Sequence, residues 1–320
     1  MKAIVRAQYG STDVLQFEEF PTPTPADNEV LIKVYAAAAN PLDLFQMKGA
    51  PWNRAIPGLR TPKQKVLGCD IAGQVEAVGR SVKQLRPGDE VFGVTGFNGG
   101  GFAEYACAIE GKLALKPANL SFDAAAAVPI AGITALQGLR DKGGIRPGHK
   151  VLIEGASGGV GTFAVQIAKA LGAEVTAVCS VRNVETARSI GADDVIDYTG
   201  VDFTRSRQRY DLILAANAHH SLFDYRRALT PDGIYVAVGG GVRRILEALS
   251  LGPLLSLLGR RKMRFCVASI SQKDLVFLKD LLETGKVVPV IDRRYPLSDT
   301  GEALRYLAEG HAQGKVVITV

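Results

Sequence analysis

The amino-acid sequence predicts an α/β protein with two domains, one rich in β-strands and one built on a parallel sheet. Three observations lead to this prediction. The chain has 320 residues, which is more than a domain with a single hydrophobic core usually contains. Up to about residue 120, alternating or apolar runs are separated by Pro and Gly clusters, a pattern typical of short strands. From about Ser121, strand candidates alternate with helical stretches, which indicates a parallel sheet covered by helices on both faces.

The elements can be assigned in chain order. The strands expected in the first domain are KAIVRA, EVLIKVYA, AGQVEAVG and DEVFGV, and together they predict a barrel-like arrangement. The second domain should contain the strands KVLIEGA, EVTAVCS, DDVIDY, YDLILAAN and GIYVAVGG, with helices such as Thr162 to Leu171 between them. The runs VVPVIDRRYP and KVVITV look like strands of the first domain again. The expected division is therefore residues 1–121 with 286–320, and residues 122–285.

Composition excludes several classes of protein. Hydrophobic residues make up 47% and charged residues 22% of the chain, as in ordinary globular proteins. The net charge of +6 includes short arginine clusters without interleaved aromatic residues, so we interpret them as solvated faces and not as a nucleic-acid site. No stretch offers the roughly 20 apolar residues of a membrane span, so stable membrane insertion is not expected.

The four cysteines indicate a reducing compartment. They lie too far apart for a CxxC pair, so neither a structural zinc lobe nor a dithiol is expected; they are Cys69, Cys107, Cys179 and Cys266. The first residues, MKAIVRAQYG, alternate like a strand and lack the apolar core of a signal peptide. We therefore expect the protein in the cytoplasm.

A glycine-rich turn is the strongest local signal. In VLIEGASGGVGTFAVQIAKALGA, residues 151–173, an apolar strand runs through a glycine cluster directly into a helix. Such a turn lets the backbone approach a pyrophosphate at the helix N-terminus, although Ala156 stands at the first glycine position of the usual pattern. A tight turn without a ligand is the weaker alternative. The predicted cofactor contacts here are Ser157, Gly158, Gly159, Val160 and Gly161.

The end of the next strand indicates which dinucleotide is bound. NAD sites usually place an acid there for the ribose 2′-hydroxyl, whereas this chain has Ser180 and Arg182, which suit a 2′-phosphate. NADPH is therefore favoured. Tyr198 could cover the adenosine or simply pack. Asn217 and Gly239 end further strands at the edge where ligands of such sheets bind.

Taken in order, several motifs resemble the medium-chain dehydrogenase/reductase superfamily and, within it, the zinc-independent quinone oxidoreductase-like branch. They include NEVLIKVYAAAANPLD, VLGCDIAGQVEAVG, LRPGDEVFG, AAAVPIAGITAL, GADDVIDY and GKVVITV, and they span essentially the whole chain. The resemblance implies a GroES-like catalytic domain closed by the C-terminal segment, an inserted Rossmann domain, and a cleft for nicotinamide and substrate. It also implies a homodimer.

The chain departs from the zinc alcohol dehydrogenases of this superfamily at the metal positions. Asn40 stands at the first cysteine position, Gly68-Cys69-Asp70 at the Gly-His-Glu position, and Ile130 four residues before Thr134. A catalytic zinc needs three protein ligands. No metal is therefore expected, and Asp70 would instead pair with a nearby cation.

A site without a metal favours conjugated acceptors. Hydride addition to a quinone or an enone leaves a delocalised anion that needs no Lewis acid. Asn40 could contact the substrate carbonyl or the nicotinamide amide, or only shape a turn. Thr134, by analogy with the family, could touch the nicotinamide, or only pack its helix. Lys315 could approach the cofactor or be a surface lysine.

Two further features complete the prediction. Trp52 is expected to form an apolar wall of the substrate pocket. His219-His220 is interpreted as solvated, with a role as acid or base as the weaker alternative. The leading hypothesis is an NADPH-dependent reductase of a small-molecule quinone or α,β-unsaturated carbonyl. The alternative is an NADPH-binding sensor with little turnover, using RRILEALSLGPLLSLLGRR as its contact surface; the same segment could instead be a lid or face a dimer partner.

Overall fold

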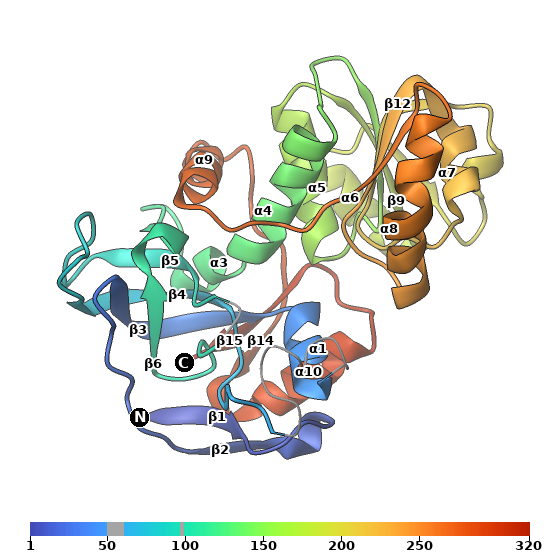
Figure 1. The fold of residues 1–320 in the computed structure, drawn as a ribbon. Helices are drawn as coiled ribbons and strands as arrows, with labels where there is room; N and C mark the ends of the chain where they lie inside the picture. The colour runs from blue at the N-terminus through green and yellow to red at the C-terminus, as the bar shows by residue number, and fades with distance from the viewer. Residues whose placement is uncertain (50–60, 97–98) are drawn as a thin grey trace. The chain divides into compact units, whose positions relative to one another are not determined.

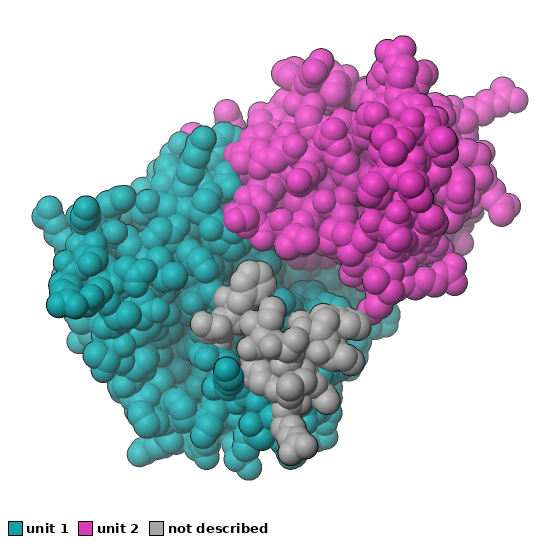
Figure 2. Space-filling view, in the orientation of Figure 1, with its two compact units in different colours: residues 1–130, 270–283, 289–320 teal, residues 131–269, 284–288 magenta. Residues whose placement is uncertain are grey.

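A computed structural model describes residues 1–49, 61–96 and 99–320. Trp52, expected in the pocket wall, lies outside these residues. Contacts divide the chain into two compact units, shown in teal and magenta in Figure 2: unit 1 is Met1–Ile130, Ile270–Glu283 and Pro289–Val320, and unit 2 is Ala131–Ser269 and Thr284–Val288. The domain division at residues 121/122 and 285/286 stays a prediction.

Unit 1 is built on antiparallel strands. Its seven-stranded sheet has the order β14-β15-β3-β4-β5-β7, with β6 also paired to β3, and a second sheet joins β1 to β2. Its elements are β1 Lys2–Arg6, β2 Leu15–Glu19, β3 Glu29–Ala39, α1 Pro41–Lys48, β4 Asp70–Val78, β5 Glu90–Val94, β6 Tyr105–Ile109, β7 Leu113–Leu115, α3 Phe122–Ala126, α9 Gln272–Glu283, β14 Ile291–Pro296, α10 Thr300–Ala308 and β15 Lys315–Thr319.

The C-terminal segment completes this unit. β15 pairs antiparallel with β3, with Val316 opposite Ala39, so residues far apart in the sequence are neighbours beside the site described below (Figure 1). The small residues Ala36 to Ala39 at this end of β3 are all buried, which lets neighbouring strands and α1 pack closely. The core contains Ile32, Val34 and Ile71 among others.

Unit 2 is a parallel sheet with helices on both sides (Figure 1). Its strand order is β10-β9-β8-β11-β12-β13. The elements are β8 Lys150–Glu154, α5 Gly159–Ala170, β9 Glu174–Cys179, α6 Val184–Ser189, β10 Asp194–Asp197, β11 Tyr210–Ala215, α7 Leu222–Ala228, β12 Leu229–Ala237, α8 Val242–Leu257 and β13 Lys262–Phe265; α4 Pro129–Gln137 crosses the division of the units and continues as the π-helical turn Gly138–Lys142.

The strand order of unit 2 creates a ligand-binding edge. The chain runs outward from β8 through β9 to β10, then returns to the other side of β8 as β11. Loops after β8 and β11 therefore leave the sheet in opposite directions, and open parallel sheets bind ligands at this switch point. The strands are buried apolar runs, as expected for a sheet covered on both faces. The α/β prediction, with a GroES-like β-rich unit and a Rossmann unit, is confirmed.

Within the described residues, no helix is both long and apolar enough to cross a membrane.

Candidate active site

The glycine turn joins β8 to α5 as the sequence predicts. Gly158 is the N-cap of α5 and offers no side-chain oxygen, so the first N–H groups of the helix are left for another acceptor. A Cβ on Gly161 would lie 2.0 Å from the Gly155 carbonyl oxygen, so only glycine lets α5 pack this closely. A Cβ on Gly158 would meet nothing nearer than 3.6 Å. Gly161 therefore serves packing, while Gly158 leaves open space at the N-terminus of α5, where the pyrophosphate is predicted to bind.

The end of β9 lies against this turn. The N–H groups of Gly155 and Ala156 both donate to the Val178 carbonyl, each at 3.1 Å. Ser180 follows β9, and its hydroxyl accepts from Asn183 Nδ2 at 3.1 Å. Asn183 is buried, and its Oδ1 has no partner among the described residues. An unpaired buried oxygen beside Ser180 fits a site completed by a ligand donor.

Three more predicted cofactor residues lie at the same edge. Tyr198 is exposed, and its N–H donates to the Cys179 carbonyl at the end of β9, at 3.2 Å. Asn217 packs against the turn, because a Cβ added to Gly155 would lie only 3.1 Å from the Asn217 Cβ. A Cβ on Gly239 would lie 2.3 Å from the Ala216 carbonyl oxygen. The structure thus brings together the glycine turn, the β9 end with exposed Arg182, Tyr198, Asn217 and Gly239.

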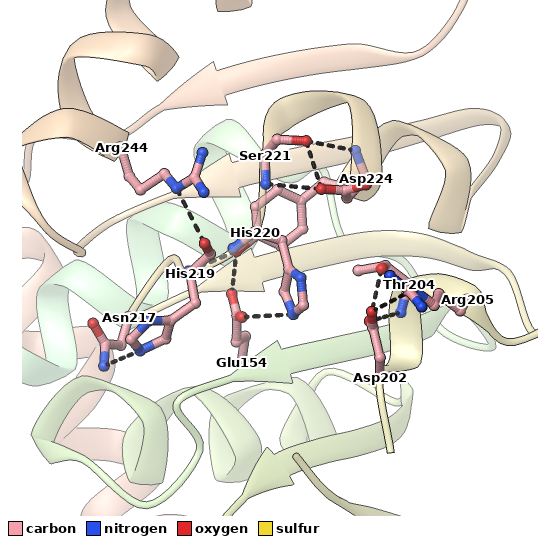
Figure 3. Close-up of polar contacts among 11 residues, drawn as sticks. Glu154, Asp202, Thr204, Arg205, Asn217, His219, His220, Ser221, Asp224 and Arg244 are labelled. Atoms are coloured by element: carbon pink, nitrogen blue, oxygen red, sulfur yellow. Dashed lines mark hydrogen bonds and ion pairs between the residues drawn. The ribbon is translucent and has the colours of Figure 1, made fainter. Parts of the chain in front are cut away.

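A buried carboxylate that sequence analysis missed lies beneath this edge. Glu154, the last residue of β8, is 4% exposed and accepts a 2.5 Å hydrogen bond from the Tyr225 hydroxyl. The Tyr225 oxygen in turn accepts from the backbone N–H groups of His219 and His220, at 3.1 and 3.2 Å. Figure 3 shows the His220 ring facing Glu154, with Nε2 3.9 Å from Oε1. The loop after β11 is therefore held by one phenol and one carboxyl group.

Burial controls the protonation of this cluster. It raises the pKa of Glu154 to about 7, against the opposing hydrogen bond from Tyr225. Burial also lowers the pKa of His220, while Asp202 and Asp224 act in the opposite direction. His220 stacks edge-on against Phe203 with ring centroids 5.0 Å apart, so its ring is packed and not simply solvated, unlike the expectation from sequence. His219 is exposed, and its Nε2 lies 3.0 Å from Asn217 Nδ2.

Unit 1 holds the second group of predicted residues, a buried polar network around Asn40. Asn40 Nδ2 donates to the Ala38 carbonyl at 3.1 Å and to Asp70 Oδ2 at 3.0 Å. Lys315 Nζ donates to Asn40 Oδ1 at 2.7 Å and to Asp70 Oδ2 at 3.3 Å. Asp70 Oδ1 accepts from the Ile130 N–H at 3.0 Å. Asp70 is thus paired with a cation, and Lys315 is 3% exposed and not a surface lysine.

The geometry limits what Asn40 and Lys315 can do. Both amide protons of Asn40 go to protein oxygens, so donation to a substrate carbonyl requires one of these bonds to open, whereas Oδ1 has a second lone pair that can accept from a nicotinamide amide. Lys315 donates two of its three protons to the described residues, which leaves one for a cofactor oxygen. Their roles at the site stay predictions.

Asp43 adds a second carboxyl group that sequence analysis missed. Its Oδ2 accepts from the Asn40 N–H at 2.8 Å and caps α1, whereas its Oδ1 has no partner among the described residues. Burial, with the neighbouring Asp70, raises the pKa of Asp43 to about 7. Burial likewise raises the pKa of Asp70, although Lys315 and Asn40 oppose it. The sequence did contain a signal for Asp43, because an acidic residue three positions after the N-cap Asn40 has the spacing of a capping box.

These residues do not fit a catalytic zinc. The Lys315 ammonium already pairs with Asp70 and donates to the Asn40 oxygen, and it would repel a divalent cation. Burial and the two aspartates raise the pKa of Cys69 well above its usual range, so its thiol is neutral in this structure. Within residues 1–49, 61–96 and 99–320, no group of His, Cys, Asp and Glu forms a metal-binding cluster.

Thr134 lies in α4 and is 8% exposed. One turn later, a Cβ on Gly138 would lie 2.7 Å from Leu214 and 3.1 Å from Val238, so the helix packs directly on β11 and the end of β12. This position suits either predicted role, packing or contact with a nicotinamide, and the contact stays a prediction.

Comparisons with known proteins agree with this architecture. Residues 26–118 match the family described as "Alcohol dehydrogenase GroES-like domain", and residues 190–318 match "Zinc-binding dehydrogenase". The "Chloroplast envelope quinone oxidoreductase homolog" of Arabidopsis thaliana is 34% identical over 99% of this chain and 98% of its own length. The "NADPH-dependent alkenal/one oxidoreductase, chloroplastic" of the same plant is 34% identical over 99% of this chain and 79% of its own.

A solved structure extends the likeness to three dimensions. The quinone oxidoreductase from Coxiella burnetii superposes with a TM-score of 0.87 and 31% identity, covering 100% of this chain and 99% of that one. With its GroES-like and Rossmann units and relatives matched from end to end, the chain belongs to the medium-chain dehydrogenase/reductase superfamily, in the quinone oxidoreductase-like branch.

Proposed function

We propose that the protein is an NADPH-dependent oxidoreductase that transfers hydride to a quinone or an α,β-unsaturated carbonyl without zinc. The observation that carries this proposal is the Lys315 ammonium, which donates to Asn40 and Asp70 and would repel a metal beside Asn40, the residue at the first zinc-ligand position. The relatives named as a quinone oxidoreductase homolog and an alkenal/one oxidoreductase support the same reaction class.

The residues at the carboxyl edge of unit 2 suit NADPH. The uncapped N-terminus of α5 would receive the pyrophosphate, with Gly158 leaving room for it. Ser180 and Arg182 would bind the 2′-phosphate, and Tyr198 would cover the adenosine. When bound, NADPH supplies the hydride. Asn217 and Gly239, beside the turn, would border the other half of the cofactor.

The choice of acceptor follows from how negative charge is stabilised. A simple ketone becomes an alkoxide on reduction, and a site of this type would need a Lewis acid to stabilise it. A quinone or an enone yields a delocalised phenolate or enolate, which solvent can protonate. In this scheme the protein mainly binds, orients and excludes competing water.

Within that scheme, Asn40 is proposed to orient the substrate carbonyl or the nicotinamide amide, and Thr134 to contact the nicotinamide. Lys315 and Asp70 hold the Asn40 side chain in one rotamer, since they engage its oxygen and one of its protons. Lys315 can in addition give its remaining proton to a cofactor oxygen.

A panel of acceptors tests the proposal. Purified protein is mixed with NADPH and, in separate assays, with small quinones, alkenals or simple ketones. Primary alcohols are tested with NADP⁺. The absorbance of the cofactor is followed in every assay. Turnover should be confined to the conjugated acceptors. Tight NADPH binding with no oxidation across the panel would instead favour the sensor hypothesis.

The homodimer and the cytoplasmic location also remain predictions. Analytical ultracentrifugation of the purified protein and fractionation of the native cell test them.

A further inference from the structure

The loop of residues 216–221, which joins β11 to α7, is held by the hydroxyl group of Tyr225. This hydroxyl accepts from the N–H groups of His219 and His220, at 3.1 and 3.2 Å, and donates its own proton to Glu154. A phenol has one proton and two lone pairs, so all of its hydrogen-bonding capacity is used here. The course of the loop is therefore tied to the position of one oxygen atom.

The Tyr225 hydroxyl is itself held in place by buried groups. The Tyr225 side chain is fully buried, and its ring stacks on Tyr235 of β12 with ring centroids 4.3 Å apart. Glu154 ends β8, an interior strand of the sheet, and its carboxyl group accepts the phenol proton. The stacked ring fixes where the oxygen lies, and Glu154 fixes where the proton points, which leaves both lone pairs for the loop.

The same loop orients Asn217, the residue predicted to border the cofactor. Asn217 Nδ2 lies 3.0 Å from His219 Nε2, as Figure 3 shows. An amide nitrogen can only donate, so the imidazole accepts through Nε2. This bond fixes the rotation of the exposed Asn217 amide, and with it the direction of Oδ1. Holding the His219 backbone therefore also sets how Asn217 is presented beside the glycine turn.

Other contacts anchor the two ends of the loop. The N–H groups of Ala216 and Ala218 donate to carbonyl groups at or just beyond the ends of neighbouring strands, at 2.9 and 3.2 Å, and Ser221 caps α7. Arg244 Nε donates to the His219 carbonyl at 3.1 Å. Without the phenol, the two histidine N–H groups would lose their acceptor, and the loop would shift or admit water to satisfy them.

We propose that Tyr225 and Glu154 are positioning residues for the dinucleotide: they hold the loop, and through it Asn217, in the shape that receives NADPH. They act through Asn217 and need not touch the cofactor. A loop that already has its bound shape loses less conformational entropy when the ligand binds, so affinity is gained by preorganisation. This inference rests on the proposed binding of NADPH at the carboxyl edge of unit 2 and adds two buried residues to it.

Fluorescence titration of the purified full chain with NADPH tests the proposal, because binding needs no substrate. Tyr225→Phe keeps the ring and removes the hydroxyl, and it should raise the Kd for NADPH about tenfold. The Kd for NADH should rise by the same factor, since Ser180 and Arg182 follow β9 on the other side of β8. A change in the ratio of the two Kd values would show a general distortion of the edge and overturn the proposal.

Two substitutions of Glu154 separate its hydrogen bond from its mere presence. Glu154→Leu offers the phenol no acceptor and should raise the Kd for NADPH about tenfold, like Tyr225→Phe. Glu154→Gln keeps an oxygen that can accept the phenol proton, so it should rescue binding to within about threefold of the wild type. Equal Kd values for these two variants would overturn the proposal, and this comparison decides the question if Tyr225→Phe does not fold.

A double-mutant cycle shows whether the phenol acts through Asn217. Asn217→Ala alone should weaken NADPH binding. Adding Tyr225→Phe to it should weaken binding by no more than about twofold further, because the side chain that the phenol orients is already gone. Effects of the two substitutions that multiply would contradict the proposed route.

Tyr210→Phe is the matched control. Tyr210 is also fully buried in unit 2, at the opposite end of β11, and its hydroxyl has no partner among the described residues. This variant should bind NADPH like the wild type. Thermal unfolding is measured for every variant, and a lowered Tm with an unchanged Kd in Tyr225→Phe and Glu154→Leu would mean that the cluster only stabilises the fold.

The outcomes also separate this proposal from the proposed function. A wild-type protein that binds neither NADPH nor NADH would overturn both. NADPH binding that is equally tight in the wild type and in all the variants would overturn only the positioning role. Tight binding without turnover, together with the expected losses, would support the positioning role while arguing against the proposed reaction.

Discussion

Arg182 and Ser180 stand at the end of β9 in place of the acid that an NAD site uses. If Arg182 binds the 2′-phosphate, Arg182→Ala should raise the KM for NADPH by about tenfold or more and leave the KM for NADH nearly unchanged, because NADH lacks that phosphate. Steady-state kinetics with both cofactors measure this. Arg188→Ala, an exposed arginine on the following α6, is the control and should change neither value. An equal change in the KM values for NADPH and NADH would show that Arg182 does not bind the 2′-phosphate.

Lys315 is the only cation that the structure shows against Asp70 within the described residues. Lys315→Met should destabilise the fold by about 3–5 kcal/mol at neutral pH, because it leaves a buried carboxylate unpaired. Since protonation removes the Asp70 charge, this loss should shrink as the pH falls. Urea denaturation at several pH values measures it. Lys315→Met/Asp70→Asn is the control and should recover much of the lost stability; no recovery would mean that the pairing is unimportant.

Glu154 should make stability depend on pH. Its folded-state pKa of about 7 lies above the ordinary 4.5, so the native protein keeps a proton that the unfolded chain has released. Stability attributable to this group therefore falls as the pH rises from about 4.5 to about 7 and then levels off. Glu154→Gln should gain stability relative to the wild type over that window. Glu18→Gln, on exposed β2, should show no such trend, and a pH-independent difference for Glu154→Gln would contradict the account.

At the scale of elements, two glycines of the turn from β8 into α5 are expected to have different roles, Gly161 in packing and Gly158 in cofactor binding. Gly161→Ala places a methyl group 2.0 Å from the Gly155 oxygen and should cost about 1–3 kcal/mol of stability, with loss of NADPH binding. Gly158→Ala meets nothing nearer than 3.6 Å, so it should fold normally yet weaken NADPH binding, because its methyl group stands where the pyrophosphate approaches. Thermal unfolding and cofactor titration of both variants measure this. Normal NADPH affinity in Gly158→Ala would argue against the predicted seat.

Elements were more predictable from sequence than contacts between them. Apolar runs such as KVLIE and YDLILA identify strands by local composition, and the glycine cluster fixes where α5 begins. Tyr225 and Glu154 are 71 residues apart, and Lys315 and Asn40 are 275 apart, so no spacing pattern joins them. The strand pairing creates these contacts. For the same reason, His220 was expected in solvent but lies against Phe203.

At the scale of the whole molecule, the C-terminal strands complete the first unit, as the late runs VVPVIDRRYP and KVVITV predicted. This pairing of β15 with β3 is what brings Lys315 to Asn40 and Asp70. The position of the Lys315 cation thus depends on the discontinuous fold, since the chain must return to unit 1 after completing unit 2. Family resemblance could predict this return, whereas local periodicity could only indicate that the final segments are strands.

The most direct test is the rate of quinone reduction by NADPH, measured before and after exhaustive dialysis against EDTA, with the metal content of the same samples determined. The account predicts sub-stoichiometric zinc, an unchanged kcat/KM after chelation, and a strong preference for NADPH over NADH. Activity that disappears on chelation and returns with added zinc would contradict it.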